Sequence, residues 1–274
     1  MVTIAFTNQK GGTGKSTTAH ALGAGLTLKG NKVLLVDLDA QGNLTYTAGA
    51  STRGKTIADL LQQAIDGKTP DTLGAIQQTR QGDIIASNPN LAAADTILTD
   101  VTGREYKLKE ILTPVNDKYD FCILDTPPTL GTLTVNALTA ADMVIAPAQA
   151  DVYSLLAIGQ LHSTITTVKK YCNPGLAFSG IVITRYNGRA VISREVAERI
   201  GSTAAQTGTK VYNTRIRECT AIKEAEIMQT NIFEYAPRSN AAKDYTALLE
   251  EILQDVKKIR TQKKKQNRSN GHGK

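Results

Sequence analysis

Short apolar runs alternate with amphipathic segments along the chain, and this alternation predicts the order of strands and helices. A continuous apolar run such as 33–36 is typical of a strand that is buried on both faces. Such runs predict strands at 2–7, 32–37, 83–86, 119–125, 142–146, 178–184 and 210–212. Apolar residues at helical spacing predict helices at 16–29, 55–66, 90–99, 105–112, 132–140, 153–171, 191–204 and 240–260. We therefore expect an α/β fold with a doubly wound, mainly parallel sheet flanked by helices.

The length and composition predict one large domain. The chain has 274 residues, of which 41% are hydrophobic, enough for a substantial core. We see no internal repeat and no second folded unit, and we expect the domain to span residues 1–256. No run approaches the ~18 uninterrupted apolar residues of a membrane span. The chain begins with a core strand rather than a basic and apolar leader, so we expect no secretory signal.

The positive charge is concentrated at the carboxyl end. Residues 257–274 contain eight Lys and Arg residues and no acid, whereas the whole chain has a net charge of +7. Residues 1–256 therefore sum to −1. Blocks of like charge are often disordered and often contact polyanions, so we expect a disordered basic tail from residue 257. The tail has few apolar residues after Ile259, which disfavours an amphipathic helix that inserts into membranes.

A glycine-rich turn after the first strand is typical of a phosphate-binding loop. The strand at 2–7 leads into this turn, and a helix is expected to start at Ser16. In such a loop, backbone N–H groups surround a phosphate, and the helix N-terminus adds partial positive charge. Lys15 would reach the β- and γ-phosphates of a nucleotide, and the Ser16 hydroxyl would hold Mg²⁺. The predicted loop consists of Gly11, Gly12, Thr13, Gly14, Lys15, Ser16 and Thr17.

Two further strands end in carboxylates, at the edge where parallel sheets bind ligands. The run at 32–37 ends at Asp37 and is followed by Asp39, and the run at 119–125 ends at Asp125. Asp125 fits the acidic residue that holds the Mg²⁺ hydration shell. Asp39 lies just beyond its strand, where it could orient an attacking water. Together with the loop, these carboxylates predict binding of ATP and Mg²⁺.

These motifs resemble the ParA/Soj/MinD branch of P-loop ATPases, whose phosphate loop is a deviant Walker A sequence. The segment 8–18 is similar to the opening of that family almost residue for residue, although Gln9 stands where the general P-loop pattern has glycine. The segments 36–43 and 125–128 resemble its second and third motifs, with Ala40 where proline is usual. The segments 211–214 and 235–239 resemble late segments of Soj-type partition ATPases. The resemblance covers residues 1 to about 253.

The resemblance implies roles that the residues alone do not fix. Lys10 would be the signature lysine, which crosses a dimer interface to the partner's nucleotide, and Asp39 would be the catalytic aspartate. Pro237 would lie near the adenine. The implied activity is ATP hydrolysis by a homodimer that sandwiches two nucleotides. Lys10, Lys15 and Asp39 are thus the expected catalytic residues.

A second basic group lies inside the predicted domain. Arg189 follows an Asn-Gly pair and precedes a helix, and relatives use a matching arginine for nonspecific contact with DNA phosphates. Relatives commonly have Ile-Pro-Arg where this chain has Ile216-Arg217-Glu218. Arg215 and Arg217 are therefore further candidates for DNA contact, and Glu218 would repel phosphate.

Taken together, the sequence predicts a ParA-type partition ATPase. Its ATP-bound homodimer would hold nonspecific double-stranded DNA, and a ParB-like centromere-binding protein would stimulate hydrolysis and release. The three cysteines, Cys122, Cys172 and Cys219, are odd in number and far apart in the sequence, which favours a reducing compartment. We therefore expect a cytoplasmic, nucleoid-associated protein rather than a membrane-bound one. The alternatives are a MinD-like, membrane-associated positioning ATPase and a nucleotide-gated binding module with negligible turnover.

Overall fold

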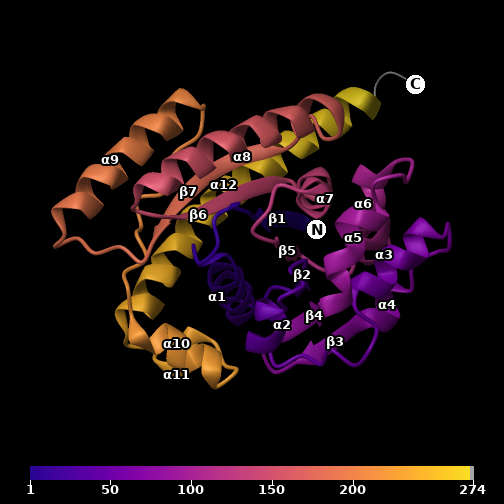
Figure 1. Ribbon diagram of the computed structural model, residues 1–274, viewed down its shortest axis with the longest axis horizontal. Helices are drawn as coiled ribbons and strands as arrows, with labels where there is room; N and C mark the ends of the chain where they lie inside the picture. The colour runs from indigo at the N-terminus through magenta and orange to yellow at the C-terminus, as the bar shows by residue number, and fades with distance from the viewer. Residues whose placement is uncertain (272–274) are drawn as a thin grey trace.

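A single seven-stranded sheet forms the centre of the described chain (Figure 1). The computed structural model describes the backbone of residues 1–271 and the side chains of residues 1–261. The strand order is β3-β4-β2-β5-β1-β6-β7, and all neighbouring pairs are parallel except β3 with β4. The strands are β1 (Val2–Phe6), β2 (Val33–Asp37), β3 (Ile76–Thr79), β4 (Gly82–Ile85), β5 (Phe121–Asp125), β6 (Met143–Gln149) and β7 (Ala177–Thr184). The predicted α/β fold with a mainly parallel sheet is confirmed.

Helices cover both faces of the sheet and connect its parallel strands. The α-helices are α1 (Lys15–Leu28), α2 (Asn43–Thr47), α3 (Ile57–Ile65), α4 (Thr72–Ala75), α5 (Ala94–Ile97), α6 (Lys107–Leu112), α7 (Thr132–Ala140), α8 (Val152–Tyr171), α9 (Val191–Gln206), α10 (Thr220–Ile227), α11 (Ile232–Tyr235) and α12 (Asn240–Gly271). Short 3₁₀ turns are η1 (Pro89–Ala93), η2 (Arg104–Tyr106) and η3 (Thr113–Val115). None of the helices within residues 1–271 combines the length and the apolar character that crossing a membrane requires.

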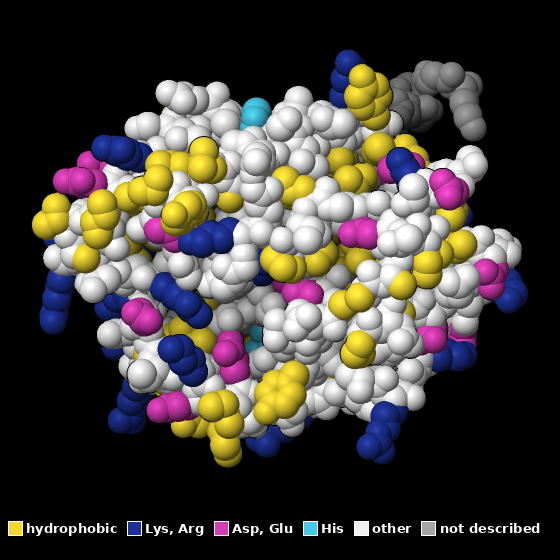
Figure 2. Space-filling model, in the orientation of Figure 1, with side chains coloured by type: hydrophobic (Ala, Val, Ile, Leu, Met, Phe, Trp, Pro, Cys, Tyr) yellow, Lys and Arg dark blue, Asp and Glu magenta, His cyan; other side chains and the backbone are white. Residues whose placement is uncertain are grey.

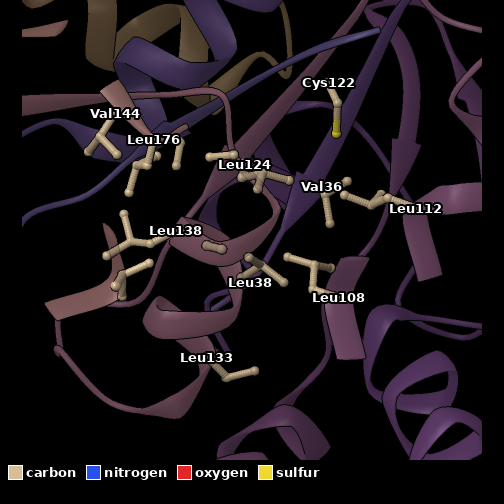
Figure 3. Close-up of a cluster of buried hydrophobic side chains, with 14 of the residues drawn as sticks. Val36, Leu38, Leu108, Leu112, Cys122, Leu124, Leu133, Leu138, Val144 and Leu176 are labelled. Atoms are coloured by element: carbon tan, nitrogen blue, oxygen red, sulfur yellow. The ribbon is translucent and has the colours of Figure 1, made fainter. Parts of the chain in front are cut away.

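The alternation of side chains along each strand divides the core into two layers. Leu34 and Val36 of β2 face the layer that contains α3, α6, α7, α8 and α9, part of which is drawn in Figure 3. Val33 and Leu35 point to the opposite face, where α1, α11 and α12 pack. Because successive strand residues point to opposite faces, a strand buried on both sides must be apolar throughout. Cys122 belongs to the first layer and is a core residue.

The structure adds elements that the apolar pattern does not predict. Strand β3 is polar, with the sequence Ile-Gln-Gln-Thr, and forms because it pairs with β4 at the edge of the sheet. Helices α2, α4, α10 and α11 have eight residues or fewer, too short for a helical period to be recognised. The predicted strand at 210–212 is reduced to an isolated bridge between Val211 and Ile181.

The sequence predicted a disordered tail from residue 257. In the structure, α12 instead continues without a break through residue 257 to Gly271. The buried side chains of Val256 and Ile259 extend the contact of α12 with the domain beyond the expected boundary at residue 256. The following lysines, glutamines and arginine favour a helix, and no proline or glycine interrupts the segment before Gly271. Residues 272–274 of the predicted tail lie outside the described residues.

Candidate functional site

The predicted phosphate loop joins the carboxyl end of β1 to the start of α1. Gly12 and Gly14 have φ angles of 73° and 81°, in the left-handed region that favours glycine. Gly14 caps α1, which begins at Lys15, so the first N–H groups of the helix face the loop. Gly11 and Gly12 are exposed at the surface of the turn. The backbone is therefore shaped to receive an anion at the helix N-terminus.

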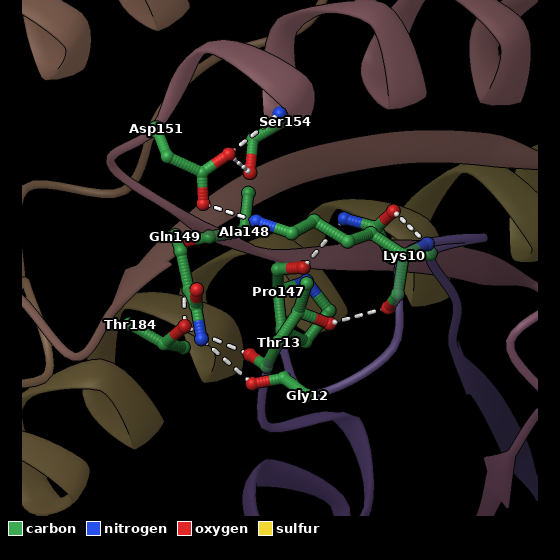
Figure 4. Close-up of polar contacts among 10 residues, drawn as sticks. Lys10, Gly12, Thr13, Pro147, Ala148, Gln149, Asp151, Ser154 and Thr184 are labelled. Carbon is green, nitrogen blue, oxygen red and sulfur yellow. Dashed lines mark hydrogen bonds and ion pairs between the residues drawn. The ribbon is translucent and has the colours of Figure 1, made fainter.

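Side chains from the neighbouring strands hold this loop in place (Figure 4). The Gln149 amide, at the end of β6, donates a hydrogen bond to the Gly12 carbonyl at 2.7 Å. The Thr184 hydroxyl, at the end of β7, donates to the Thr13 carbonyl at 2.8 Å. Because these bonds occupy carbonyl groups, the N–H groups on the other side of the turn remain available for a ligand. Sequence reasoning did not identify either supporting residue.

Lys15 points into the protein at the base of the loop. Its side chain is buried, and burial lowers the pKa of its ammonium, whereas the carboxylates of Asp125 and Asp39 act in the opposite direction. Its Nζ lies 3.4 Å from the Lys10 carbonyl oxygen. Ser16 and Thr17 follow in the first turn of α1. The structure thus brings Lys15, Ser16 and two predicted acidic residues to one point.

Asp125 and Asp37 end two adjacent strands and are paired in register. Both side chains are fully buried. Burial raises the pKa of Asp125 well above its usual range, and the Asp37 carboxylate raises it further. Burial also raises the pKa of Asp37 to about 6, although hydrogen bonds from Thr45 oppose this. Two carboxylates so close together favour a cation nearby when both are charged.

Asp37, which the sequence analysis did not select as a site residue, anchors the segment that carries Asp39. Its Oδ1 accepts a hydrogen bond from the Asp39 N–H at 3.1 Å, and its Oδ2 accepts from the N–H and hydroxyl of Thr45 at 2.8 and 2.7 Å. Asp37 therefore fixes both ends of the 39–45 turn. The Asp39 side chain accepts from the Gln41 N–H at 3.0 Å and is 7% exposed. The turn holds the Asp39 carboxylate at the edge of the loop.

Lys10 lies on the other side of the loop from Lys15. Its ammonium forms an ion pair with the carboxylate of Asp151, in the segment between β6 and α8 (Figure 4). The side chains of Lys10 and Asp151 are 26% and 32% exposed. Asp151 also caps α8 by accepting a hydrogen bond from the Ser154 N–H at 3.0 Å. Lys10 thus points away from the phosphate loop of its own chain.

Two hollows meet beside the loop. The first, which we call the phosphate hollow, has a volume of about 530 Å³, within the usual range for ligand sites. The second, narrower one, which we call the side hollow, lies between the loop and α10. The phosphate hollow is lined by Gly11, Gly12, Gly14, Lys15, Ser16, Thr17, Asp39, Gln41, Asn43, Tyr46, Thr47, Pro128, Arg185, Lys223, Glu226 and Ile227. Pro237, predicted to lie near the adenine, lines neither hollow.

The three arginines predicted to contact DNA have different surroundings. Arg189 is exposed, and its backbone N–H bonds to the Asn187 side chain in the turn before α9. The Arg215 guanidinium stacks on the Tyr186 ring, 4.5 Å from its centroid. Arg217 donates two side-chain hydrogen bonds to the Asp244 carboxylate, at 2.9 and 2.6 Å. Arg217 thus has a structural partner, and Arg189 is left as the more available cation.

The surface around α9 and α10 is basic but not uniformly so. Figure 2 shows Lys and Arg side chains gathered over this part of the molecule, with acidic side chains among them. Such a mixed surface favours weak, salt-sensitive contact with a polyanion over tight binding.

The residues present fit a nucleotide-bound Mg²⁺ ion. Both carboxylate oxygens of Asp125 are fully buried, and the Ser16 side chain lies beside them, which suits a cation or its water ligands. Within the described part of the chain, no group of three or more His, Cys, Asp or Glu residues could hold a metal by itself. A hydroxyl, a carboxylate and nucleotide phosphates together form the usual Mg²⁺ environment of P-loop enzymes. Ser16 and Asp125 would hold the ion.

Comparison with known proteins places these features in a family. Residues 1–178 match the family described as AAA domain (AAA_31). The sequence is 38% identical to the sporulation initiation inhibitor protein Soj of Bacillus subtilis, over 91% of this chain and 97% of that protein. It is 37% identical to the chromosome-partitioning ATPase Soj of Treponema pallidum, over 92% of this chain and 96% of that protein.

A solved structure shows the same fold with ligands bound. The structure named cobyrinic acid a,c-diamide synthase, from Mycobacterium smegmatis with bound ATP analog and magnesium, superposes with a TM-score of 0.81 at 32% identity. The match covers 94% of this chain and 96% of that one.

Proposed function

The chain belongs to the ParA/Soj family of partition ATPases, and on this premise we propose a nucleotide-driven cycle of dimerisation and DNA binding. It is an ATPase whose cofactors are ATP and Mg²⁺. In the proposed cycle, ATP promotes a sandwich dimer, the dimer holds duplex DNA without regard to sequence, and hydrolysis releases it. A ParB-like centromere-binding partner stimulates that hydrolysis.

The positions of Lys15 and Asp39 support the proposed hydrolysis step. When bound, Mg²⁺ neutralises phosphate charge and orients the phosphates for in-line attack. Lys15 adds a positive charge at the β- and γ-phosphates, and its burial strengthens that interaction. Asp39 orients the attacking water from the edge of the phosphate hollow, and the anchor at Asp37 holds it there. Positioning and electrostatic stabilisation account for catalysis in this class of reaction.

The proposed dimer explains why Lys10 turns away from its own phosphate loop. Its ion pair with Asp151 keeps the ammonium near the surface, where a partner subunit could meet it. In the dimer, Lys10 exchanges Asp151 for the phosphates of the partner's nucleotide. Val152, Tyr153 and Leu156, at the start of α8, expose 59%, 74% and 68% of their area beside this ion pair. An apolar surface of this kind supports a protein contact there.

The proposed DNA contact rests on the exposed Arg189 and on the basic sequence of residues 257–274. Contacts of this type reach phosphates and carry no sequence information, so they suit a protein that holds chromosomal DNA anywhere along its length. On this account the protein works in the cytoplasm, on the nucleoid. The cargo that it moves is a replicon marked by the partner.

The partition assignment is preferred to the synthase name of the Mycobacterium smegmatis structure. That structure is 32% identical to this chain, whereas the two Soj proteins are 37% and 38% identical over more than nine tenths of it. The observation that carries the proposal is the phosphate loop with Lys10 facing outward and Lys15 facing inward.

The proposal is tested by phosphate release and lipid flotation with the purified full-length protein. We expect slow ATP turnover that rises when duplex DNA and the partner are added, and no ATP-dependent flotation with anionic vesicles. Flotation without DNA stimulation would favour a membrane-associated positioning ATPase instead. Absence of turnover under every condition would favour a binding module.

A further inference from the structure

Arg185 has a backbone conformation that is unusual for a residue with a large side chain. Its φ angle is 48°, in the left-handed region, where asparagine and glycine are more readily accommodated. The neighbouring residues fix this conformation: the Thr184 hydroxyl is bonded to the phosphate loop, and the Tyr186 N–H donates to the Ile216 carbonyl at 2.9 Å. An arginine with this backbone conformation beside a ligand site suggests a role for its side chain.

The Arg185 side chain lies where the phosphate hollow meets the side hollow. Arg185, Lys223 and Glu226 line both hollows, together with Gly14 and Thr17 of the loop. Arg185 comes from the end of β7, and Lys223 comes from α10 on the opposite wall. Two cations from separate elements therefore flank one passage between the hollows.

Within the described part of the chain, the side chains of these two cations have no partner, a property that they share with Arg189 but not with three other arginines nearby. Arg217 pairs with Asp244, Arg215 bonds to the Tyr186 hydroxyl at 2.5 Å, and Arg194 bonds to the Gly188 carbonyl at 2.9 Å. Among the described residues, neither the Arg185 nor the Lys223 side chain forms an ion pair or hydrogen bond. Both are exposed, so their charges are available to an anion in the passage.

The Glu226 carboxylate brings a negative charge close to the phosphate loop, where a bound nucleotide would also be negatively charged. Its Oε1 accepts a hydrogen bond from the Thr17 hydroxyl at 2.6 Å, so a carboxylate lies beside the first turn of α1. If the β- and γ-phosphates of a nucleotide rested on Gly12–Lys15, its α-phosphate would lie toward Thr17, a loop residue that also lines the side hollow. The Glu226 carboxylate would repel that phosphate unless opposite charges offset it.

We propose that Arg185 and Lys223 form a two-cation clamp on the α-phosphate of the bound nucleotide. The inference rests on the proposed nucleotide site and extends it to residues outside the phosphate loop. Because ATP and ADP share the α-phosphate, the clamp acts on both, unlike a contact to the γ-phosphate. It keeps the nucleotide in place after hydrolysis and ties α10 to the nucleotide-bound state.

The experiment is calorimetric titration of the full-length protein with Mg-ATP and Mg-ADP. Arg185→Asn removes the charge but suits the left-handed backbone, and Lys223→Gln removes the second charge. Each substitution should lower the affinity for Mg-ATP and for Mg-ADP by the same factor, about tenfold, which is the usual scale for a hydrogen bond to a charged group. Arg185→Lys should recover part of the loss, and the exposed Arg53→Asn should bind as wild type.

The outcomes separate this inference from the function on which it rests. Wild-type protein that bound neither nucleotide would overturn the proposed nucleotide site itself. Normal affinity of both charge-removing variants, or a loss confined to ATP, would overturn only the clamp. Loss of DNA affinity by Arg185→Asn with unchanged nucleotide affinity would reassign that arginine to DNA. If Arg185→Asn failed to fold by circular dichroism, Lys223→Gln alone would decide.

Discussion

Lys10, directly before the phosphate loop, is held by Asp151, a residue 141 positions away in the same chain (Figure 4). The ion pair joins the first motif of the sequence to the start of α8, at the edge where the proposed dimer forms. Lys10 therefore has a partner within the monomer that it must leave before it can reach a second subunit. The strength of this ion pair opposes dimerisation.

Breaking that ion pair should favour the dimer. Asp151→Asn keeps an acceptor for the Ser154 N–H, so the cap of α8 survives while the charge on Lys10 is released. Because the pair is partly exposed, we expect a shift of a few-fold, toward lower ATP concentrations, in dimer formation measured by light scattering. Lys10→Ala should show the opposite result, binding ATP without dimerising. A dimer of Lys10→Ala, or an unchanged midpoint for Asp151→Asn, would contradict this view of Lys10.

Lys15 should be indispensable for nucleotide binding. Lys15→Ala removes the buried cation at the base of the loop and leaves Asp39 and Asp125 without it. We expect nucleotide affinity to fall at least a hundredfold in calorimetry, because a buried charge on phosphate contributes more than an exposed one. The protein should remain folded, since the loop keeps its bonds to Gln149 and Thr184. Near-normal ATP affinity would show that the hollow is not the phosphate site.

Asp39 should act on hydrolysis rather than on binding. Asp39→Ala keeps the loop, Lys15 and Asp125, so ATP affinity should change less than threefold while turnover falls by about a hundredfold or more. The variant should accumulate as an ATP-bound dimer, visible by light scattering. Asp37→Asn is the matched control, because it loosens the anchor of Asp39 and should lower turnover less. Wild-type turnover of Asp39→Ala would remove its assigned role.

His20 should make stability depend on pH. It is buried in α1 without a partner for Nε2 among the described residues, and burial lowers its pKa from 6.5 to about 4. As pH falls through this range, the unfolded chain takes up a proton that the folded protein excludes, so stability is lost. We expect a loss of about 2 kcal/mol between pH 7 and 4.5.

The matched variant for this prediction is His20→Leu, compared by urea denaturation. It should lose less stability over the same interval, because it has no imidazole to protonate. Asp37 has its pKa raised to about 6, so its contribution has the opposite sign, but it is common to both proteins and cancels in the difference. Parallel pH profiles for wild type and His20→Leu would show that His20 is not the cause.

DNA affinity should respond separately to Arg189 and to the basic end of the chain. Arg189→Ala should weaken binding of all duplexes equally, and deletion of residues 257–274 should flatten the salt dependence, since each phosphate contact adds about 0.9 to the salt slope. Arg217→Ala is the matched control: it leaves Asp244 unpaired and should lower stability more than DNA affinity. Fluorescence anisotropy at several salt concentrations measures both the DNA affinity and its salt dependence. Sequence-dependent losses in Arg189→Ala would contradict a phosphate contact.

The sequence predicted those parts of the fold that depend on local patterns of apolar residues and on short motifs. The strands β1, β2 and β5 are continuous apolar runs, and the motifs that follow them meet because parallel strands end at one edge. The Asp125 carboxylate could be placed beside Lys15 for that reason alone. Strand β3 could not be predicted, because its four residues gain their conformation by pairing with β4.

The residues that hold the phosphate loop in place could not be predicted from the sequence, because they act through long-range contacts and belong to no recognisable motif. Gln149 and Thr184 bond to loop carbonyls 137 and 171 positions away, and neither belongs to a phosphate-loop motif. Asp37 lies in a recognised motif, but its role as an anchor depends on Thr45 folding back to it. The pairing of Arg217 with Asp244 likewise depends on how α12 packs.

The central claim, that nucleotide state controls DNA binding through a dimer, is tested most directly with Asp39→Ala and random-sequence duplex DNA. Binding is measured by fluorescence anisotropy with ATP, with ADP and without nucleotide, at one fixed salt concentration. The account predicts that the ATP-bound variant holds DNA at least tenfold more tightly than the other two states, and that adding Lys10→Ala abolishes this difference. Equal affinity in all three states would contradict it and would reduce the DNA contact to simple attraction between a basic segment and a polyanion.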